Sequence, residues 1–177
     1  GPGDNYDLNN SHVLPALIRK FHLAKLAGEG DENAILQDEQ KYGKLPEPYR
    51  TEILTACEKQ QTPAVMIWGT GTPKREFMHN EDMADACVHL MNLDDKQYQP
   101  LLGTNRNDGV APVVNIGVGE DITIKKLAEM IKETIGFKGE IEFDVSKPDG
   151  TLRKLLSVDL AKELGCQCGT SLHQGVT

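Results

Sequence analysis

Apolar residues recur every three to four positions in several stretches of the chain, and this spacing is typical of helices that bury one face. It predicts helices at residues 13–21, 49–57, 81–93, 123–135 and 159–164. The first helix follows Asn10 and Ser11, which are good capping residues, and it places Pro15 in its first turn. His12 therefore lies at or beside the helix N-terminus.

Short apolar or alternating stretches predict strands at residues 63–68, 75–79, 113–116, 140–145 and 155–158. Long polar segments separate several of these elements. The two longest cover residues 28–61 and residues 94–111, and the first of them contains the short predicted helix at residues 49–57. Strands and helices mix without a strict β-α-β rhythm. The pattern therefore favours an α/β class of fold, with a mixed α+β lobe and little parallel sheet.

The composition is that of a globular chain, with 177 residues, 38% hydrophobic and 26% charged. This length fits one domain over residues 1–177, or two small lobes at most. The formal charge of -8 argues against a general nucleic-acid-binding protein, because too few cations are available to displace counterions from a phosphate backbone. Neither a signal peptide nor an apolar run of the ~20 residues that a membrane span needs is evident, so we expect a cytoplasmic protein without a membrane partner.

The cysteines and the other titratable residues indicate no metal site. Cys166 and Cys168 form a lone C-x-C without a second pair, and the expected state of all four cysteines is the reduced thiol of a cytosolic protein. Gly117-Val118-Gly119 follows a predicted strand, but Ile122 replaces the third glycine of a dinucleotide-binding loop. Pattern alone therefore favours an ordinary strand-to-helix turn there.

Two loops combine residue types that suit a nucleotide. Trp68, the only tryptophan, ends an apolar strand and is followed by a glycine-rich turn and by Lys74 and Arg75. An aromatic ring to pack on a base and a guanidinium to grip a diphosphate are parts that a nucleotide site needs. The loop at residues 146–150 carries Asp149, whose carboxylate suits ribose hydroxyls. Each loop also has an ordinary interpretation as a surface turn, which the pattern alone favours.

Several segments taken together resemble the GDP-L-fucose synthase family of extended short-chain dehydrogenases. The matching segments are residues 10–21 (NSHVLPALIRKF), 68–77 (WGTGTPKREF), 115–119 (NIGVG), 143–151 (FDVSKPDGT) and 153–156 (RKLL). Their order and rough spacing also agree with the family. The resemblance runs from Gly1 to about Leu172.

The resemblance implies an NADPH-dependent epimerase and reductase that converts GDP-4-keto-6-deoxy-D-mannose to GDP-L-fucose. It matches His12 to the histidine that protonates the enolate during epimerisation, which is also the one residue here with a possible link to the cofactor site. It matches Lys20, Trp68, Arg75 and Asp149 to positions that contact the GDP-sugar. A homodimer is implied for the complete enzyme.

The resemblance also implies that the NADPH-binding Rossmann half, with its glycine-rich loop and its Y-x-x-x-K pair, would lie upstream of Gly1. We therefore expect the C-terminal, substrate-binding lobe of such an enzyme, with residues 28–61 as an insertion. Alone, this lobe is expected neither to bind NADPH nor to turn over the keto sugar. The alternative is a free-standing module that binds a nucleotide-sugar or another protein.

Overall fold

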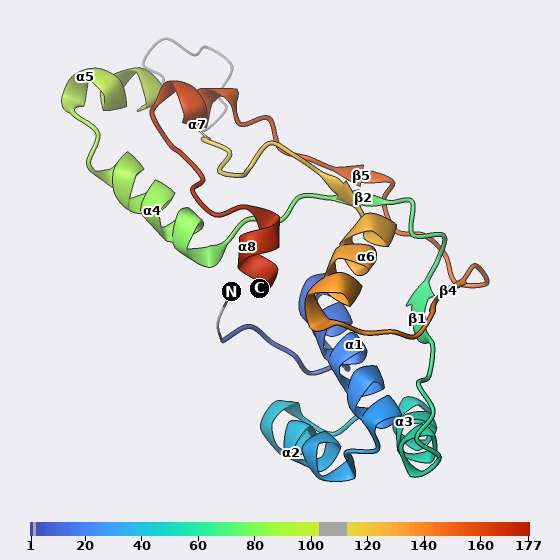
Figure 1. Cartoon of the computed structure of the whole chain (residues 1–177). Coiled ribbons are helices and arrows are strands. Elements are labelled where there is room, and N and C mark those ends of the chain that lie inside the picture. The colour runs from blue at the N-terminus through green and yellow to red at the C-terminus, as the bar shows by residue number, and fades with distance from the viewer. Residues whose placement is uncertain (2, 103–112) are drawn as a thin grey trace. The chain divides into compact units, whose positions relative to one another are not determined.

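The computed structural model describes residue 1, residues 3–102 and residues 113–177 (Figure 1). The helices are α1 (Val13–Glu29), α2 (Glu32–Tyr42), α3 (Tyr49–Glu58), α4 (Asn80–Met91), α5 (Asp95–Tyr98), α6 (Ile124–Ile135), α7 (Asp159–Glu163) and α8 (Leu172–Val176), and a 3-10 helix, η1, spans Gln99–Leu102. The strands are β1 (Val65–Trp68), β2 (Lys74–Arg75), β3 (Ile122–Thr123), β4 (Ile141–Asp144) and β5 (Arg153–Lys154). The mixed helical and stranded fold that the sequence predicts is confirmed.

The chain divides into two compact units. The larger unit holds residues 3–73 and 123–152, and the smaller unit holds residue 1 and the described parts of 74–122 and 153–177. The assignment of residues 1–177 to one lobe stays a prediction. Within the described ranges, no helix combines the length and the apolar composition that a membrane span requires.

The larger unit is built on α1, which begins at Val13 as predicted and continues to Glu29, eight residues beyond the predicted end. Its N-cap is His12, with extended backbone angles and no side-chain capping hydrogen bond, so the prediction that Asn10 or Ser11 caps the helix is wrong. Pro15 lies in the first turn, as predicted, where its missing N–H costs nothing. Gly30 ends the helix in the left-handed conformation that favours glycine.

The predicted polar segment at residues 28–61 begins in the last turn of α1 and then forms two helices that pack against α1. The predicted helix at 49–57 is confirmed as α3, whereas α2 was not predicted because Ile35 is its only buried apolar residue. The Asp31 side chain caps α2 by accepting the Ala34 N–H, which is the local signal that marks its start. The designation of residues 28–61 as an insertion stays a prediction.

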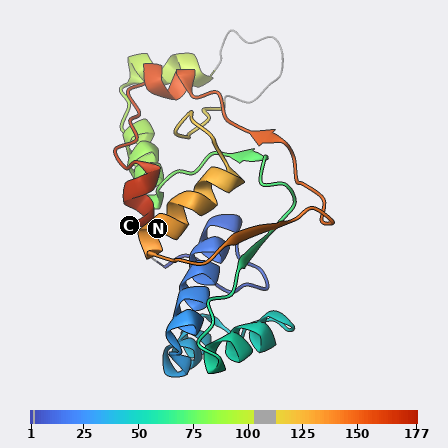
Figure 2. The ribbon, with the colours of Figure 1, turned by 45° about the vertical axis from the view of Figure 1, so that its right-hand side comes forward.

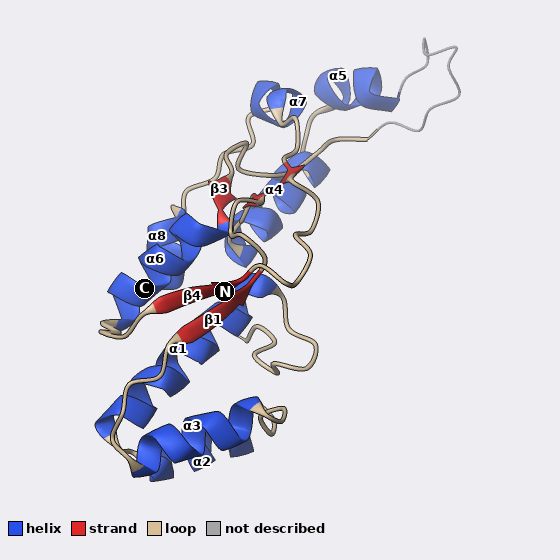
Figure 3. Ribbon diagram, turned by 90° about the vertical axis from the view of Figure 1, so that its right-hand side faces the viewer, coloured by secondary structure: helices blue, strands red, loops and turns tan. Residues whose placement is uncertain are grey.

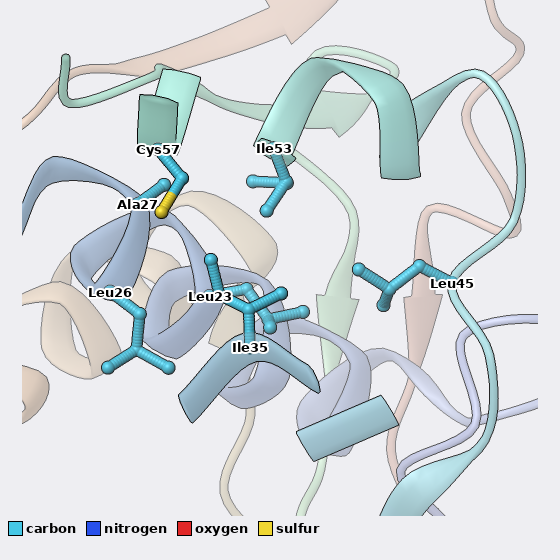
Figure 4. Packing of buried hydrophobic residues seen from close by; sticks show 7 residues of the cluster. All are labelled: Leu23, Leu26, Ala27, Ile35, Leu45, Ile53 and Cys57. Atoms are coloured by element: carbon cyan, nitrogen blue, oxygen red, sulfur yellow. The ribbon is translucent and has the colours of Figure 1, made fainter. Parts of the chain in front are cut away.

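A cluster of buried side chains joins these three helices, and Figure 4 shows it from close by. Its members are Leu23, Leu26, Ala27, Ile35, Leu45, Ile53 and Cys57. They come from α1, α2, α3 and the segment between α2 and α3, so the polar segment buries its few apolar residues against α1. Because burial of an apolar side chain contributes about 1.5–3 kcal/mol, this cluster accounts for much of the stability of the larger unit.

A buried ion pair also ties α2 to α1. The Arg19 Nε donates to Asp38 Oδ1 at 2.7 Å, and the two side chains are 1% and 5% exposed. The remaining guanidinium N–H groups donate to the backbone carbonyls of Tyr6, Tyr42 and Gly43 at 2.6 to 3.1 Å. The three guanidinium nitrogens of this buried pair therefore all have acceptors, which helps the fold to tolerate a buried charge.

On another side of α1 lies α6, whose boundaries match the prediction closely (Figure 2). The Thr123 hydroxyl caps its start by accepting the Lys126 N–H, and Gly136 ends it. Phe21 of α1 meets Phe137, just after α6, edge to face with ring centroids 5.4 Å apart. Such an arrangement is a favoured aromatic geometry and holds the two helices together.

Strands β1 and β4 lie side by side and run parallel, with Trp68 opposite Asp144 at their carboxyl ends (Figure 3). Both strands fall within predicted ones, at residues 63–68 and 140–145. In the smaller unit β2 pairs with β5, also in parallel, through Lys74 opposite Arg153 and Arg75 opposite Lys154. The strands predicted at 113–116 and 155–158 are absent from the described residues, which are irregular there.

In the smaller unit α4 lies close to the helix predicted at residues 81–93. It buries few apolar side chains and leaves several of them exposed. Ala86 and Asp82 are buried, while Met83, Val88 and Met91 are 39%, 58% and 83% exposed. The predicted polar connection at residues 94–111 contains α5 and η1 in its first part, and the rest of it lies outside the described residues.

The segment after α7 lies against α4. Asp82 accepts the N–H groups of Gly169 and Thr170 at 3.0 and 3.1 Å, and the His89 imidazole is hydrogen-bonded to the Leu164 carbonyl at 2.7 Å. Burial raises the pKa of the Asp82 carboxyl, but the two backbone N–H groups outweigh it, so the pKa lies below its usual value. The ionised carboxylate therefore holds the C-terminal segment to α4.

The first prediction concerns the Arg19–Asp38 pair. Asp38→Ala leaves a buried guanidinium without its counter-charge, so we expect the free energy of unfolding to fall by about 3–5 kcal/mol in urea titrations. Gln37→Ala, an exposed change on the same helix, is the control and should cost less than about 0.5 kcal/mol. Similar losses for both variants would contradict this account of the pair.

The second prediction concerns pH. Because the pKa of Asp82 is lower in the folded state, its stabilisation is present above the unfolded value of about 3.9 and is lost as the pH falls through the folded value. The wild-type chain should therefore lose more unfolding free energy between about pH 5 and pH 3 than Asp82→Asn, measured by urea unfolding. Asp85→Asn, on the exposed side of α4, is the matched control and should follow the wild type.

Candidate functional site

The candidate site lies in the larger unit, at the carboxyl ends of β1 and β4. Trp68 ends β1, and Asp144 ends β4 directly opposite it. Each strand is followed by a loop that the sequence singled out: residues 69–73 after β1 and residues 145–150 after β4. Because neighbouring parallel strands deliver their following loops to the same edge of the sheet, segments about 75 residues apart meet there, and such edges are common ligand sites.

The turn at residues 69–73 is held in a conformation that requires glycine. Gly69 and Gly71 have φ values of 80° and 72°. A Cβ on Gly69 would lie 2.2 Å from Asp149 Oδ1, and one on Gly71 would lie 2.4 Å from the Phe143 ring. Both the backbone angles and the surrounding atoms therefore exclude side chains, so the turn packs closely against the β4 loop.

Asp149 fixes this turn to the β4 loop. Its Oδ1 accepts the Thr70 N–H at 2.8 Å, and its Oδ2 accepts the Thr70 hydroxyl at 2.7 Å. The hydroxyls of Thr70 and Thr72 are 2.7 Å apart, which extends the network along the turn. Each carboxylate oxygen retains a lone pair, so Asp149 can accept a ligand hydroxyl while it holds the turn.

The N-terminus of α6 completes the support of the turn. The Lys125 N–H donates to the Gly71 carbonyl at 2.9 Å, and the Ile124 N–H donates to the Pro73 carbonyl at 3.0 Å. The first N–H groups of a helix have no hydrogen-bond acceptor within the helix. The carbonyls of the turn accept two of these N–H groups, and the same hydrogen bonds fix the position of the turn. The turn is thus held by the β4 loop and by α6 together.

Trp68 projects from this supported edge into solvent. Its side chain is 70% exposed, which is unusual for the one tryptophan of a chain with a packed core. The Lys147 ammonium lies over the indole, 5.8 Å from the ring centroid. An exposed aromatic ring on a rigid edge is a surface on which a planar base can stack.

The β4 loop is ordered by its own first residue. Asp144 Oδ1 accepts the Ser146 hydroxyl at 2.5 Å and the Ser146 N–H at 3.1 Å, and the Asp144 carbonyl accepts the Lys147 N–H at 3.2 Å. The Ser146 hydroxyl is the main cause that lowers the pKa of the Asp144 carboxyl, which stays ionised. The backbone of Lys147 is therefore fixed, while its side chain remains exposed.

Lys20 approaches the same strand from α1. Its Nζ donates to the Met66 carbonyl of β1 at 3.4 Å and lies 6.0 Å from the centre of the Tyr49 ring. Burial lowers the pKa of this ammonium group. Lys20 thus contacts the strand that carries Trp68, although its amine is partly withdrawn from solvent.

His12 and Arg75 belong to elements other than β1, β4 and the loops that follow these strands. His12 is exposed at the N-cap of α1, eight residues and about 12 Å along the helix from Lys20. Arg75 belongs to the smaller unit, where it follows Lys74 in β2 and its Nη1 donates to the Lys74 carbonyl at 2.7 Å. Lys74 itself pairs with Asp121 at 3.8 Å, so the two adjacent cations have different surroundings.

The Gly117–Gly119 loop does not fit a dinucleotide. The Gly119 N–H donates to Glu76 Oε1 at 2.6 Å, and a Cβ on Gly117 would lie 2.5 Å from the same oxygen. A carboxylate of the chain itself thus takes the place that a pyrophosphate would need, so this loop is a structural turn and we assign no cofactor step to it. Among the described residues, no group of three or more His, Cys, Asp or Glu is arranged to hold a metal ion.

The structure adds two residues that the sequence did not assign to the site. Thr70 links the two loops, and Lys147 lies on the Trp68 ring. Both belong to segments that the sequence had marked, yet their partners are about 80 residues away along the chain. The charged loop at residues 146–150 was the only local signal for Lys147.

Comparison with known proteins supports the resemblance over the whole chain. The sequence profile of the NAD dependent epimerase/dehydratase family matches residues 39–103. GDP-L-fucose synthase 1 of Arabidopsis thaliana is 37% identical over 177 residues, covering 100% of this chain and 40% of the relative. GDP-L-fucose synthase of Escherichia coli is 38% identical over 180 residues, covering 99% and 43%. The chain thus spans about two fifths of the length of these relatives.

Solved structures agree in fold. A GDP-6-OMe-4-keto-L-xylo-heptose reductase from Campylobacter jejuni has a TM-score of 0.78 and 37% identity, with coverage of 97% of this chain and 47% of that chain. A GDP-D-glycero-L-gluco-heptose synthase from the same organism, determined in the presence of NADPH, has a TM-score of 0.77 and 34% identity, covering 99% and 48%. The fold therefore recurs as about half of larger proteins whose names refer to GDP-sugars.

The third prediction tests the turn. Gly69→Ala should destabilise the chain by at least about 1 kcal/mol more than Gly136→Ala, because both have positive φ but only Gly69 would meet a carboxylate. In the Asp149→Ala background the excess cost of Gly69→Ala should shrink, giving a coupling of about 0.5–3 kcal/mol in a double-mutant cycle followed by urea unfolding. Equal costs at Gly69 and Gly136, with no coupling, would contradict the described packing.

Proposed function

We propose that the chain is the C-terminal, GDP-sugar-binding part of a GDP-L-fucose synthase, an enzyme that epimerises and then reduces GDP-4-keto-6-deoxy-D-mannose with NADPH. The observation that carries this proposal is the exposed Trp68 at a glycine-rich turn, which Asp149 and α6 hold at the carboxyl edge of two parallel strands. The similarity over the full chain to GDP-L-fucose synthases supports it.

In this proposal Trp68, Asp149 and Lys20 of the larger unit bind the nucleotide-sugar. The Trp68 indole packs on the base, and the Asp149 carboxylate accepts a hydroxyl of the ligand while it holds the turn. Lys20 contributes positive charge beside β1. Arg75, which the resemblance also matches to a GDP-sugar contact, carries a two-pronged guanidinium that suits a diphosphate. Because the chain is acidic overall, these local cations rather than the net charge attract the phosphates.

His12 is the proposed acid of the epimerisation. A positioned imidazolium can deliver a proton to the carbon of an enolate, and this contribution is typically about two to four orders of magnitude in rate. The exposed position of His12 at the start of α1 leaves its imidazole accessible to a substrate. NADPH supplies the hydride for the reduction, and within this proposal its site belongs to the Rossmann half, so the chain alone is inactive.

A second candidate function is a protein-interaction module. The observation in its favour is the apolar stripe on α4, where Met83, Val88 and Met91 are exposed together. Such a stripe suits contact with another protein surface. Static light scattering tests whether the stripe binds a second copy of the chain, because self-association through it would show a mass above 19.5 kDa that Met91→Lys returns to the monomer value.

The fourth prediction tests the proposed function by titration calorimetry. GDP should bind to the chain, and Trp68→Ala should weaken binding by about 5- to 150-fold, because stacking of one base on an aromatic side chain contributes about 1–3 kcal/mol. Val145→Ala removes a comparably exposed apolar side chain of the β4 loop and should leave the affinity for GDP unchanged. NADPH should produce no binding heat.

Two results would contradict the proposal. Absence of GDP binding by a chain that unfolds cooperatively in urea would remove the nucleotide-sugar site. Tight binding of NADPH would show that the chain holds a cofactor site of its own.

A further inference from the structure

Lys147 is the one cation of the larger unit that the structure places on the Trp68 ring. We infer that Lys147 is a further ligand-binding residue of this edge: its ammonium contacts the phosphates of a nucleotide whose base stacks on Trp68. The inference rests on the proposed function and adds a phosphate contact that comes from the same edge as the stacking surface.

The backbone of Lys147 is held in place. Its N–H donates to the Asp144 carbonyl, and Asp144 also accepts the N–H and the hydroxyl of Ser146. Two residues later, Asp149 joins the loop to Thr70. The Cα of Lys147 therefore keeps its place beside Trp68, whereas its long and exposed side chain can reach an anion next to the indole.

The charges around Lys147 leave its ammonium available. The two acids of the loop have hydrogen-bond donors of their own, since Asp144 accepts from Ser146 and Asp149 accepts from Thr70, and Lys147 is only a minor cause of the lowered pKa of Asp144. No salt bridge found within the described ranges includes Lys147. An exposed cation–π contact is weak, whereas a hydrogen bond from an ammonium to a phosphate is charge-assisted, so a bound phosphate would draw the ammonium away from the ring.

A simpler role for Lys147 would be to cover the Trp68 indole without contacting a phosphate. At 5.8 Å from the ring centroid the ammonium is near the outer limit of a cation–π contact. If covering were its role, removing Lys147 would change binding of any base on Trp68, with or without phosphates. If the phosphate contact is its role, only ligands that carry phosphates respond.

The experiment uses the 177-residue chain and the fluorescence of its one tryptophan, which reports directly on ligands that stack at this edge. Guanosine and GDP are titrated against the wild type, Lys147→Gln and Lys138→Gln, the last being an exposed lysine elsewhere in the larger unit. Urea unfolding of each variant verifies that the fold is intact, which is expected because both side chains are exposed.

Lys147→Gln should weaken GDP binding about tenfold and change guanosine binding less than about twofold, while Lys138→Gln matches the wild type for both ligands. Added salt should weaken GDP binding more in the wild type than in Lys147→Gln, because screening removes an attraction that the variant lacks. Either unchanged GDP affinity in Lys147→Gln, or equal weakening for guanosine and GDP, would overturn the inference. If neither guanosine nor GDP changes the fluorescence of Trp68 in the wild type, the proposed function fails together with the inference. This result differs from the two above, in which the wild type binds GDP and only the role of Lys147 is overturned.

Discussion

The glycine-rich turn at residues 69–73 is the constraint on which the larger unit depends. Neither Gly69 nor Gly71 has room for a Cβ, and the carbonyls of Gly71 and Pro73 accept the first N–H groups of α6. The same turn receives Asp149 from the β4 loop through Thr70. Displacing it would leave helix N–H groups and a carboxylate without partners, so strand, helix and loop keep their places together.

This constraint explains why an exposed tryptophan is compatible with a stable fold. Trp68 is the last residue of β1, and its backbone is paired with β4, so its position is set without any contribution from its side chain. The core that stabilises the unit lies instead around α1, where Leu23 and Ile53 are buried with their neighbours. Stability and ligand contact are thus carried by different residues, and the indole remains available for a ligand.

Local patterns in the sequence predicted the elements that have a strong apolar face or a clear cap. The helix from Thr123 to Gly136 was found because apolar spacing and both caps agree, whereas α2 was missed because Ile35 alone marks its buried face. Within the candidate site, motifs in the sequence mark Trp68 and Asp149, and their roles stay predictions. Their partners Thr70 and Lys147 were not assigned, because the hydrogen bonds and ring contact that involve them depend on the parallel pairing of β1 with β4, which no local pattern encodes.

The two lysines near β1 illustrate how an acidic chain can present positive charge selectively. Lys20 is drawn against the Met66 carbonyl and the Tyr49 ring, and burial lowers the pKa of its ammonium, so its charge is costly to keep in the absence of an anion. Lys147 lies on a fixed loop, with its exposed side chain over the Trp68 ring. In the proposed function a phosphate beside β1 would relieve this cost at Lys20, although the chain as a whole carries a net charge of -8.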